Sequence, residues 1–337
     1  MTNIARALGL ALALMATQAS AQDFWQGKTV TLLAGPPAGS DHDKLARLVA
    51  KHLATQLPGK PTINVDNRSS NNGVDALNSF YSDAPKDGTA LHLLMPGMAL
   101  MQAVGAPNVK YDAGKLAIVG NLSRAPQVLM TWWVTGFKTI DDGRRREMAL
   151  GAIGPVSLGA IYPEILNVML RTRFKTVSNY RREADMDEGM QNTEIGGRFA
   201  SYATIAATHP DWIAQKRVAF LAQVGLTKYK DLPDVPLLTE LTTNERDRAL
   251  LAFVSRDAEH ARTLAAAPGT PADRLDALRK AFDAMLNDDA FLAEARAGRL
   301  EISASDGASA AKAIADELGT PRDVVERGKA IVAPIFR

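Results

Sequence analysis

The chain of 337 residues contains no cysteine, which excludes disulfides, thiol nucleophiles and thiolate metal sites. The hydrophobic core must therefore be large enough to hold the protein folded. The five histidines form no HxxxH or HxH pair, so their spacing predicts no metal site. Basic residues number 39 and acidic residues 37, and this near balance gives no electrostatic reason to expect nucleic acid as a partner.

Long apolar runs are also scarce. After residues 1–21, no segment approaches the roughly 20 apolar residues that a membrane span needs. Residues 1–21 have a basic start ending at Arg6, an apolar run over 7–16, and small residues at 19 and 21. This pattern is typical of a secretory signal peptide cleaved after Ala21. The alternative is an N-terminal membrane anchor, for which the apolar run is short. We therefore expect a soluble protein exported to the periplasm.

The chain beyond residue 21 alternates between predicted strands and helices. Short runs of apolar and β-branched residues predict strands over 28–34, 61–66 and 90–95, each followed by a loop and a helix. Asp41 or Asp43 is expected to cap the first of these helices. Such alternation predicts a mostly parallel α/β sheet, in which ligands bind beyond the carboxyl ends of the strands. The loops after these strands, 35–43, 67–73 and 95–98, should therefore gather at one rim.

A second α/β region begins near residue 128. Strands are predicted at 128–134, 147–152, 174–178, 195–198 and 218–224. The last 80 or so residues change character and predict four amphipathic helices, over 271–286, 289–297, 308–318 and 321–331. No internal repeat is found, so a solenoid is excluded.

Several motifs occur in a fixed order along the mature chain. Residues 30–47 read VTLLAGPPAGSDHDKLAR, 65–68 read VDNR, 151–157 read GAIGPVS, 232–236 read LPDVP, and 267–271 read APGTP. Together they resemble the motifs of the substrate-binding proteins of tripartite tricarboxylate transporters, the Bug family. The resemblance implies two α/β domains that close on a ligand like a flytrap. Domain one would hold 22–127 and 253–337, including the C-terminal helices, and domain two 128–252.

The same resemblance implies a function. The chain would be a periplasmic solute-binding protein that captures a small carboxylate and passes it to the membrane permease subunits of a tripartite transporter. It would be a monomer, with no cofactor and no enzymatic activity. Helix N-termini and glycine-rich loops suit an anion, because they present free backbone N–H groups. Carried over position by position, the ligand-binding residues are Pro37, Ala38, Gly39, Ser40, Asp43, Asn67, Arg68, Gly73, Gly154, Ser157, Tyr180 and Asp185.

This chain departs from the family pattern near the presumed cleft. Ser40 replaces a glycine with Asp41 beside it, and Val156 and Arg182 replace glycines of domain two. Asp41 would put a negative charge where a carboxylate is expected, unless it caps the helix and faces away. Arg181 and Arg182 could offset that charge by binding the carboxylate, or they form a solvated flank of the next helix.

Two other functions remain open from the sequence. The liganded protein would dock on a membrane sensor kinase if it served signalling rather than transport. A hydrolase is suggested by four adjacent residues, Ser40, Asp41, His42 and Asp43. However, adjacent loop residues point in different directions, and the chain has no Gly-x-Ser-x-Gly elbow.

Overall fold

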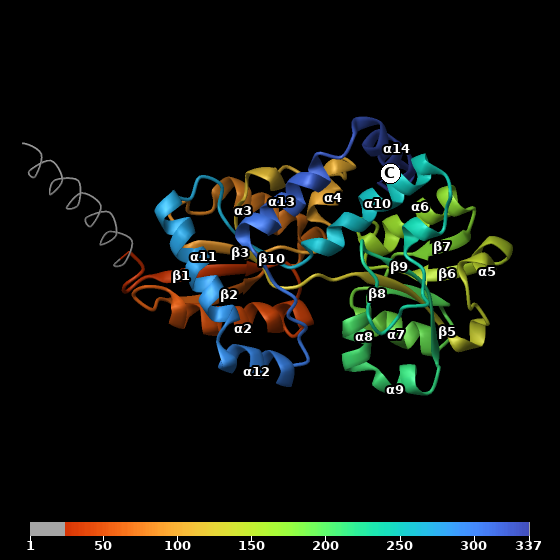
Figure 1. The fold of residues 1–337 in the computed structure, drawn as a ribbon, viewed down its shortest axis with the longest axis horizontal. Helices are drawn as coiled ribbons and strands as arrows, with labels where there is room; N and C mark the ends of the chain where they lie inside the picture. Colours follow the sequence, from red (N-terminus) through yellow and green to blue (C-terminus); the bar gives the residue numbers. More distant parts are fainter. Residues whose placement is uncertain (1–23, 337) are drawn as a thin grey trace, which may run out of the picture.

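The computed structural model describes residues 24–336, so the expected signal peptide and its cleavage site lie outside the described residues. The described strands form two separate sheets, which lie side by side in Figure 1. The first sheet has the order β11 (Ser305–Asp306), β4 (Ala117–Asn121), β10 (Thr263–Ala266), β3 (Ala90–Leu93), β1 (Thr29–Ala34), β2 (Thr62–Asn67). The second has the order β7 (Arg173–Val177), β6 (Glu147–Gly151), β8 (Gly197–Ser201), β5 (Gln127–Trp132), β9 (Val218–Val224).

Most strands of each sheet run in one direction, as expected, but each sheet also contains a reversed strand. In the first sheet β1 pairs in parallel with β2 and β3, whereas β10 is antiparallel to β3 and β4. In the second, β6 pairs in parallel with β7 and β8, whereas β5 is antiparallel to β8 and β9. β5 and β10 are the strands by which the chain enters one sheet from the other. Each begins at the edge where its parallel neighbours end, so each must run in the opposite direction.

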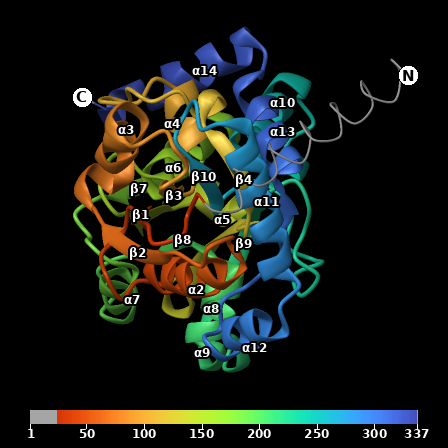
Figure 2. The ribbon, with the colours of Figure 1, turned by 90° about the vertical axis from the view of Figure 1, so that its left-hand side faces the viewer.

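Helices cover both faces of each sheet. On β1, Leu32 and Leu33 point to opposite cores because side chains alternate along a strand. The core around Leu32 packs against α2 (Asp41–Gln56), α11 (Ala272–Leu286) and α12 (Asp289–Ala297). The core around Leu33 packs against α3 (Val74–Asp83), α4 (Met98–Ala103) and α13 (Gly307–Leu318), on the other side of the sheet in Figure 2. We call this sheet with these helices the first domain.

The second domain consists of the second sheet and its helices. These helices are α5 (Ile140–Arg145), α6 (Leu158–Leu170), α7 (Glu183–Gln191), α8 (Tyr202–Thr208), α9 (Pro210–Ala214), α10 (Glu245–Ser255) and α14 (Arg322–Val332). The strand expected over 195–198 begins two residues later, because the Ile195 amide donates to the Gly189 carbonyl of α7 at 3.3 Å. Among residues 24–336, no helix is long and apolar enough to cross a bilayer.

The C-terminal helices divide between the domains, which corrects part of the expectation. α11, α12 and α13 pack on the first domain, but α14 packs against α10 and α6 (Figure 1). Val332 is fully buried in a core that joins the second domain to Leu100 and Met101 of α4, and Val324 and Val325 pack against this core. The chain therefore passes between the domains three times: between β4 and β5, between α10 and β10, and between α13 and α14. The domain limits at 127 and 253 stay a prediction.

Candidate ligand-binding site

The three loops of the first domain meet at one rim, as predicted. β1, β2 and β3 end in register, since Ala34 lies opposite both Asn67 and Leu93. The loops that follow touch one another: a Cβ on Gly35 would lie 3.1 Å from Met95 Cγ and 3.2 Å from the Gly73 Cα. Gly73 has φ +83°, so both its backbone and its neighbours favour glycine there.

The first loop is closed by reciprocal hydrogen bonds at the start of α2. The Asp43 amide donates to Ser40 Oγ at 3.2 Å, and the Gly39 amide donates to Asp43 Oδ2 at 2.7 Å. Ser40 is therefore the N-cap, and the expectation that Asp41 or Asp43 caps this helix is wrong. Pro37, Ala38 and Gly39 are exposed at the rim, as a ligand-binding loop requires.

The Asp43 side chain holds the first loop in place. Its side chain is buried, and Arg47 Nε donates to Asp43 Oδ2 at 3.1 Å. Burial would raise the pKa of Asp43, but hydrogen bonds from Arg47 and the Gly39 amide outweigh it and hold the pKa below its ordinary value. The carboxylate is therefore ionised, and its other oxygen, Oδ1, lies 3.1 Å from Arg47 Nη2.

The second loop supports the first. Asn67 Nδ2 donates to the Pro36 carbonyl at 2.9 Å, and Asn67 Oδ1 accepts from Arg47 Nη2 at 3.2 Å. Arg68 directly follows β2 and is exposed, and its guanidinium pairs with Asp66 of β2 at 2.8 Å. Asn67 thus positions the rim, while Arg68 already has an acidic partner.

One loop of the second domain meets this rim. Ser157 occupies the N-cap position of α6, but its hydroxyl donates to the Gly154 carbonyl at 3.0 Å, which closes the loop. A Cβ on Gly97 would lie 3.0 Å from Leu158 Cδ2. Leu158, the first residue of α6, therefore touches the loop after β3, and the Gly154–Ser157 loop directly precedes this contact in the chain.

Tyr180 and Asp185 lie elsewhere in the second domain. They line a pocket of about 400 Å³ whose walls all belong to that domain. The Tyr180 hydroxyl donates to Glu194 at 3.4 Å, and Asp185 pairs with Arg182 at 2.5 Å. Arg182 is thus already paired, whereas Arg181 lines the pocket. The contacts of Tyr180 and Asp185 do not join them to the rim loops.

A small cavity lies between the two domains, and no sequence motif pointed to it. Asp41, Arg262 and Glu301 of the first domain line it together with Ser201 and Thr204 of the second. Its volume is about 10 Å³, enough for about one water-sized sphere. Asp41 therefore faces the domain boundary, where it pairs with Lys44 at 3.0 Å.

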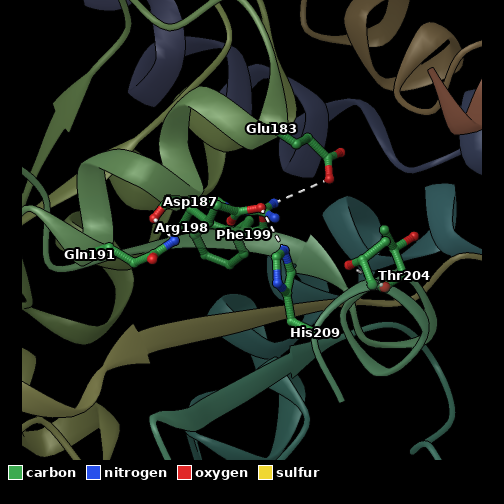
Figure 3. A network of polar contacts seen from close by, with 8 residues as sticks. Glu183, Asp187, Gln191, Arg198, Phe199, Thr204 and His209 are labelled. Carbon is green, nitrogen blue, oxygen red and sulfur yellow. Dashed lines mark hydrogen bonds and ion pairs between the residues drawn. The ribbon is translucent and has the colours of Figure 1, made fainter. Parts of the chain in front are cut away.

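A buried arginine holds the second domain together (Figure 3). Arg198 on β8 is 1% exposed; its Nε donates to Asp187 at 2.8 Å and its Nη1 to Glu183 at 3.3 Å. His209 Nε2 lies 3.2 Å from the second oxygen of Asp187. Two carboxylates thus compensate this guanidinium, so the network is structural and does not offer a free charge to a ligand.

Ser40 and His42 do not form a nucleophile and base. His42 Nε2 bonds to the Leu93 carbonyl at 3.1 Å, while Ser40 Oγ accepts from the Asp43 amide. Burial and the charge of Arg262 lower the pKa of His42 to about 3, so the ring is neutral. The arrangement fits a packed histidine behind the rim and gives a serine no activating base.

One buried group has the ligand types of a metal site. Asp257, His260 and Glu317 offer atoms within 4.8 Å of one another, the only such group among residues 24–336. Hydrogen bonds already engage its members: His260 pairs with Glu317, and the Gly97 amide donates to Asp257 at 2.6 Å. Sequence spacing could not find this group, since 57 residues separate His260 from Glu317.

Comparison with known proteins adds the fold. No protein-family model and no curated protein match the chain. Among solved structures, the periplasmic binding protein BugD is 16% identical over 90% of this chain and 98% of its own, with a TM-score of 0.68. Rpa4515 of R. palustris, solved with adipate, is 20% identical over the same shares, with a TM-score of 0.68. MatC (Rpa3494) from Rhodopseudomonas palustris, solved with bound malate, is 16% identical over 90% and 98%, with a TM-score of 0.64. The chain therefore has the two-domain α/β fold of the TctC and Bug solute-binding proteins.

Proposed function

We propose that this chain is an exported solute-binding protein of the tripartite tricarboxylate transporter family, which captures a small carboxylate and passes it to a membrane permease. The observation that carries the proposal is a fold shared over nearly the whole chain with structures solved with adipate and malate. The secretory pattern of residues 1–21 supports export to the periplasm. The ordered motifs from residue 30 to residue 271 support the family.

The geometry of the rim supports an anion as the ligand. The loop after β3 touches the start of α6 in the second domain, and Pro37, Ala38 and Gly39 leave backbone exposed next to the start of α2. A helix N-terminus favours negative charge. The Gly39 amide is already taken by Asp43, so the ligand requires further donors from the domain boundary.

The geometry also favours binding over catalysis. Ser40 and His42 bond to different backbone groups, and both residues serve local packing. A two-domain protein that closes on its ligand needs only differential affinity for the open and closed forms. We therefore propose a binder without enzymatic activity.

Uptake by whole cells tests the proposal. The acid that co-purifies with the exported protein is identified by mass spectrometry, and its uptake is measured in cells with and without the gene. We expect the deletion to abolish uptake at low concentration and the restored gene to rescue it. Unchanged uptake would contradict the transport role and favour docking on a sensor kinase.

A further inference from the structure

We infer that the carboxylate is anchored by Arg262, whose guanidinium faces the cavity between the two domains. The inference rests on the proposed function and names the residue that would recognise the acid. It differs from the twelve residues that sequence resemblance indicates, none of which supplies a free cation to the domain boundary.

The backbone of Arg262 is held where the chain returns to the first domain. Arg262 directly precedes β10, the strand that enters the first sheet between β3 and β4. Its amide donates at 3.2 Å to Oδ1 of Asn121, a fully buried residue at the end of β4. A side chain on this segment therefore starts from a fixed point at the hinge, as a ligand anchor should.

Arg262 is the unpaired guanidinium of the cavity. Three arginines line it, and two of them already have partners: Arg124 pairs with Glu259 at 3.4 Å, and Arg299 donates to the Ala207 carbonyl at 2.5 Å. The guanidinium of Arg262 has no hydrogen bond or ion pair with any residue that the structure describes, although the residue is half-buried. A partly desolvated charge without a partner is unfavourable, and an incoming anion would relieve it.

The charges around the cavity leave room for one anion. Two carboxylates line it, and Asp41 is paired with Lys44. Burial raises the pKa of the other, Glu301, which favours its neutral form, although the charge of Arg262 opposes this. Neither carboxylate forms an ion pair with the Arg262 guanidinium in the described part of the chain, so a single carboxylate of a ligand would supply its counter-ion.

The opposite wall suits a carboxylate as well. Ser201 and Thr204 of the second domain also line the cavity, together with Arg262 of the first. A guanidinium offers parallel N–H donors that match the two oxygens of a carboxylate. Hydroxyl groups can donate further hydrogen bonds to the same carboxylate oxygens. The cavity of about 10 Å³ is too small for an organic acid, so the domains must separate for entry and close on the ligand.

Calorimetric titration of variants tests the anchor. The probes are adipate, malate and a panel of other small mono- and dicarboxylates, titrated into the mature protein. We expect Arg262→Gln to weaken binding of each acid that wild type binds by at least about tenfold. Arg262→Lys should lie between the two, because it keeps the charge but loses the planar fork. The matched control is Arg296→Gln, which removes the same charge from the exposed end of α12, outside the cavity, and should stay within about threefold of wild type.

The outcomes separate the anchor from the function. If wild type binds an acid and Arg262→Gln binds it equally well, the anchor is wrong while the function stands. If Arg296→Gln weakens binding as much as Arg262→Gln, the effect is general electrostatics and the anchor is again wrong. If wild type binds no carboxylate, the proposed function fails, and the anchor fails with it. Thermal unfolding without ligand verifies that each variant is folded, and Arg262→Lys serves if the glutamine variant is not.

Discussion

Nε2 of His260 lies 2.5 Å from Oε2 of Glu317, inside a cluster buried at the domain boundary. His260 follows α10, where the chain returns to the first domain, and Glu317 ends α13, where the chain leaves it again. Burial disfavours the charged imidazole, but the hydrogen bond and the charge of Glu317 outweigh it and raise the pKa of His260. One ion pair thus joins two of the three segments that connect the domains.

Asp257, the third member of this cluster, makes the stability depend on pH. Burial raises the pKa of Asp257 from 3.8 to about 7, and the charge of Glu317 adds to the rise. Because the pKa of Asp257 is higher in the folded than in the unfolded state, its protonation stabilises the folded protein. This stabilisation is fully present below pH 3.8 and is lost as pH rises to about 7. The free energy of unfolding of Asp257→Asn should therefore rise, relative to that of wild type, by up to about 1.4 kcal/mol for each pH unit in this window. Urea unfolding of both proteins across the window measures the gain, and a difference that is constant with pH would count against the buried carboxyl.

Asp43 should show the opposite pH dependence. The pKa of Asp43 is held low in the folded state, so its stabilisation is present above 3.8 and is lost as pH falls through the folded value. Asp43→Asn should lower the free energy of unfolding by about 1–3 kcal/mol at neutral pH, with the loss shrinking in acid. Asp41→Asn is the control, because the Asp41–Lys44 pair is more exposed and should matter less. Equal losses in the free energy of unfolding for the two variants, measured with denaturant, would contradict this stabilising role of Asp43.

Arg198 should be essential for the stability of the second domain. Arg198→Met leaves Asp187 without its buried partner, which costs about 3–5 kcal/mol in comparable cases. Thermal and urea unfolding measure this loss. Arg182→Met provides the comparison, since Arg182 pairs with Asp185 in an exposed position. A smaller loss in Arg198→Met than in Arg182→Met would overturn the structural role of the network.

Alanine substitutions at two rim glycines distinguish the cost of backbone strain from the cost of a steric contact. Gly39 and Gly73 have similar positive φ values, +87° and +83°, so alanine at either costs about 1 kcal/mol or more in strain. Nothing lies within 4 Å of a Cβ on Gly39, whereas one on Gly73 would lie 3.1 Å from Met95 Cγ. Gly73→Ala should therefore reduce the melting temperature more than Gly39→Ala. Identical shifts would mean that the loops are not packed as described.

Local signals predicted much of the first domain. The strands β1, β2 and β3 and the rim loops after them follow from short apolar runs ended by Gly, Pro and Asn, and these signals act within a few residues. These signals therefore predict that the first two loops lie at one rim. They do not predict that Ser40, rather than an aspartate, caps α2. Turn chemistry and helix capping compete for the same polar residues, which explains that error.

Other features depend on contacts between distant segments. The opposite direction of β5 and β10 follows from how the chain crosses between the domains, and no local pattern encodes it. α14 is amphipathic in either location, so its apolar stripe could not reveal which domain it packs on. Arg262 lies in an ordinary stretch of sequence and becomes a candidate only because β10 brings it to the domain boundary.

The central claim is that this two-domain protein binds small carboxylates. Isothermal titration calorimetry of the mature chain against mono- and dicarboxylates, with the matching uncharged amides as controls, tests it most directly. We predict saturable binding of at least one acid at micromolar concentration, corresponding to about −8 kcal/mol at 1 μM, and none of its amide. Absence of binding by every acid at millimolar concentration, or equal binding of acid and amide, would contradict the account.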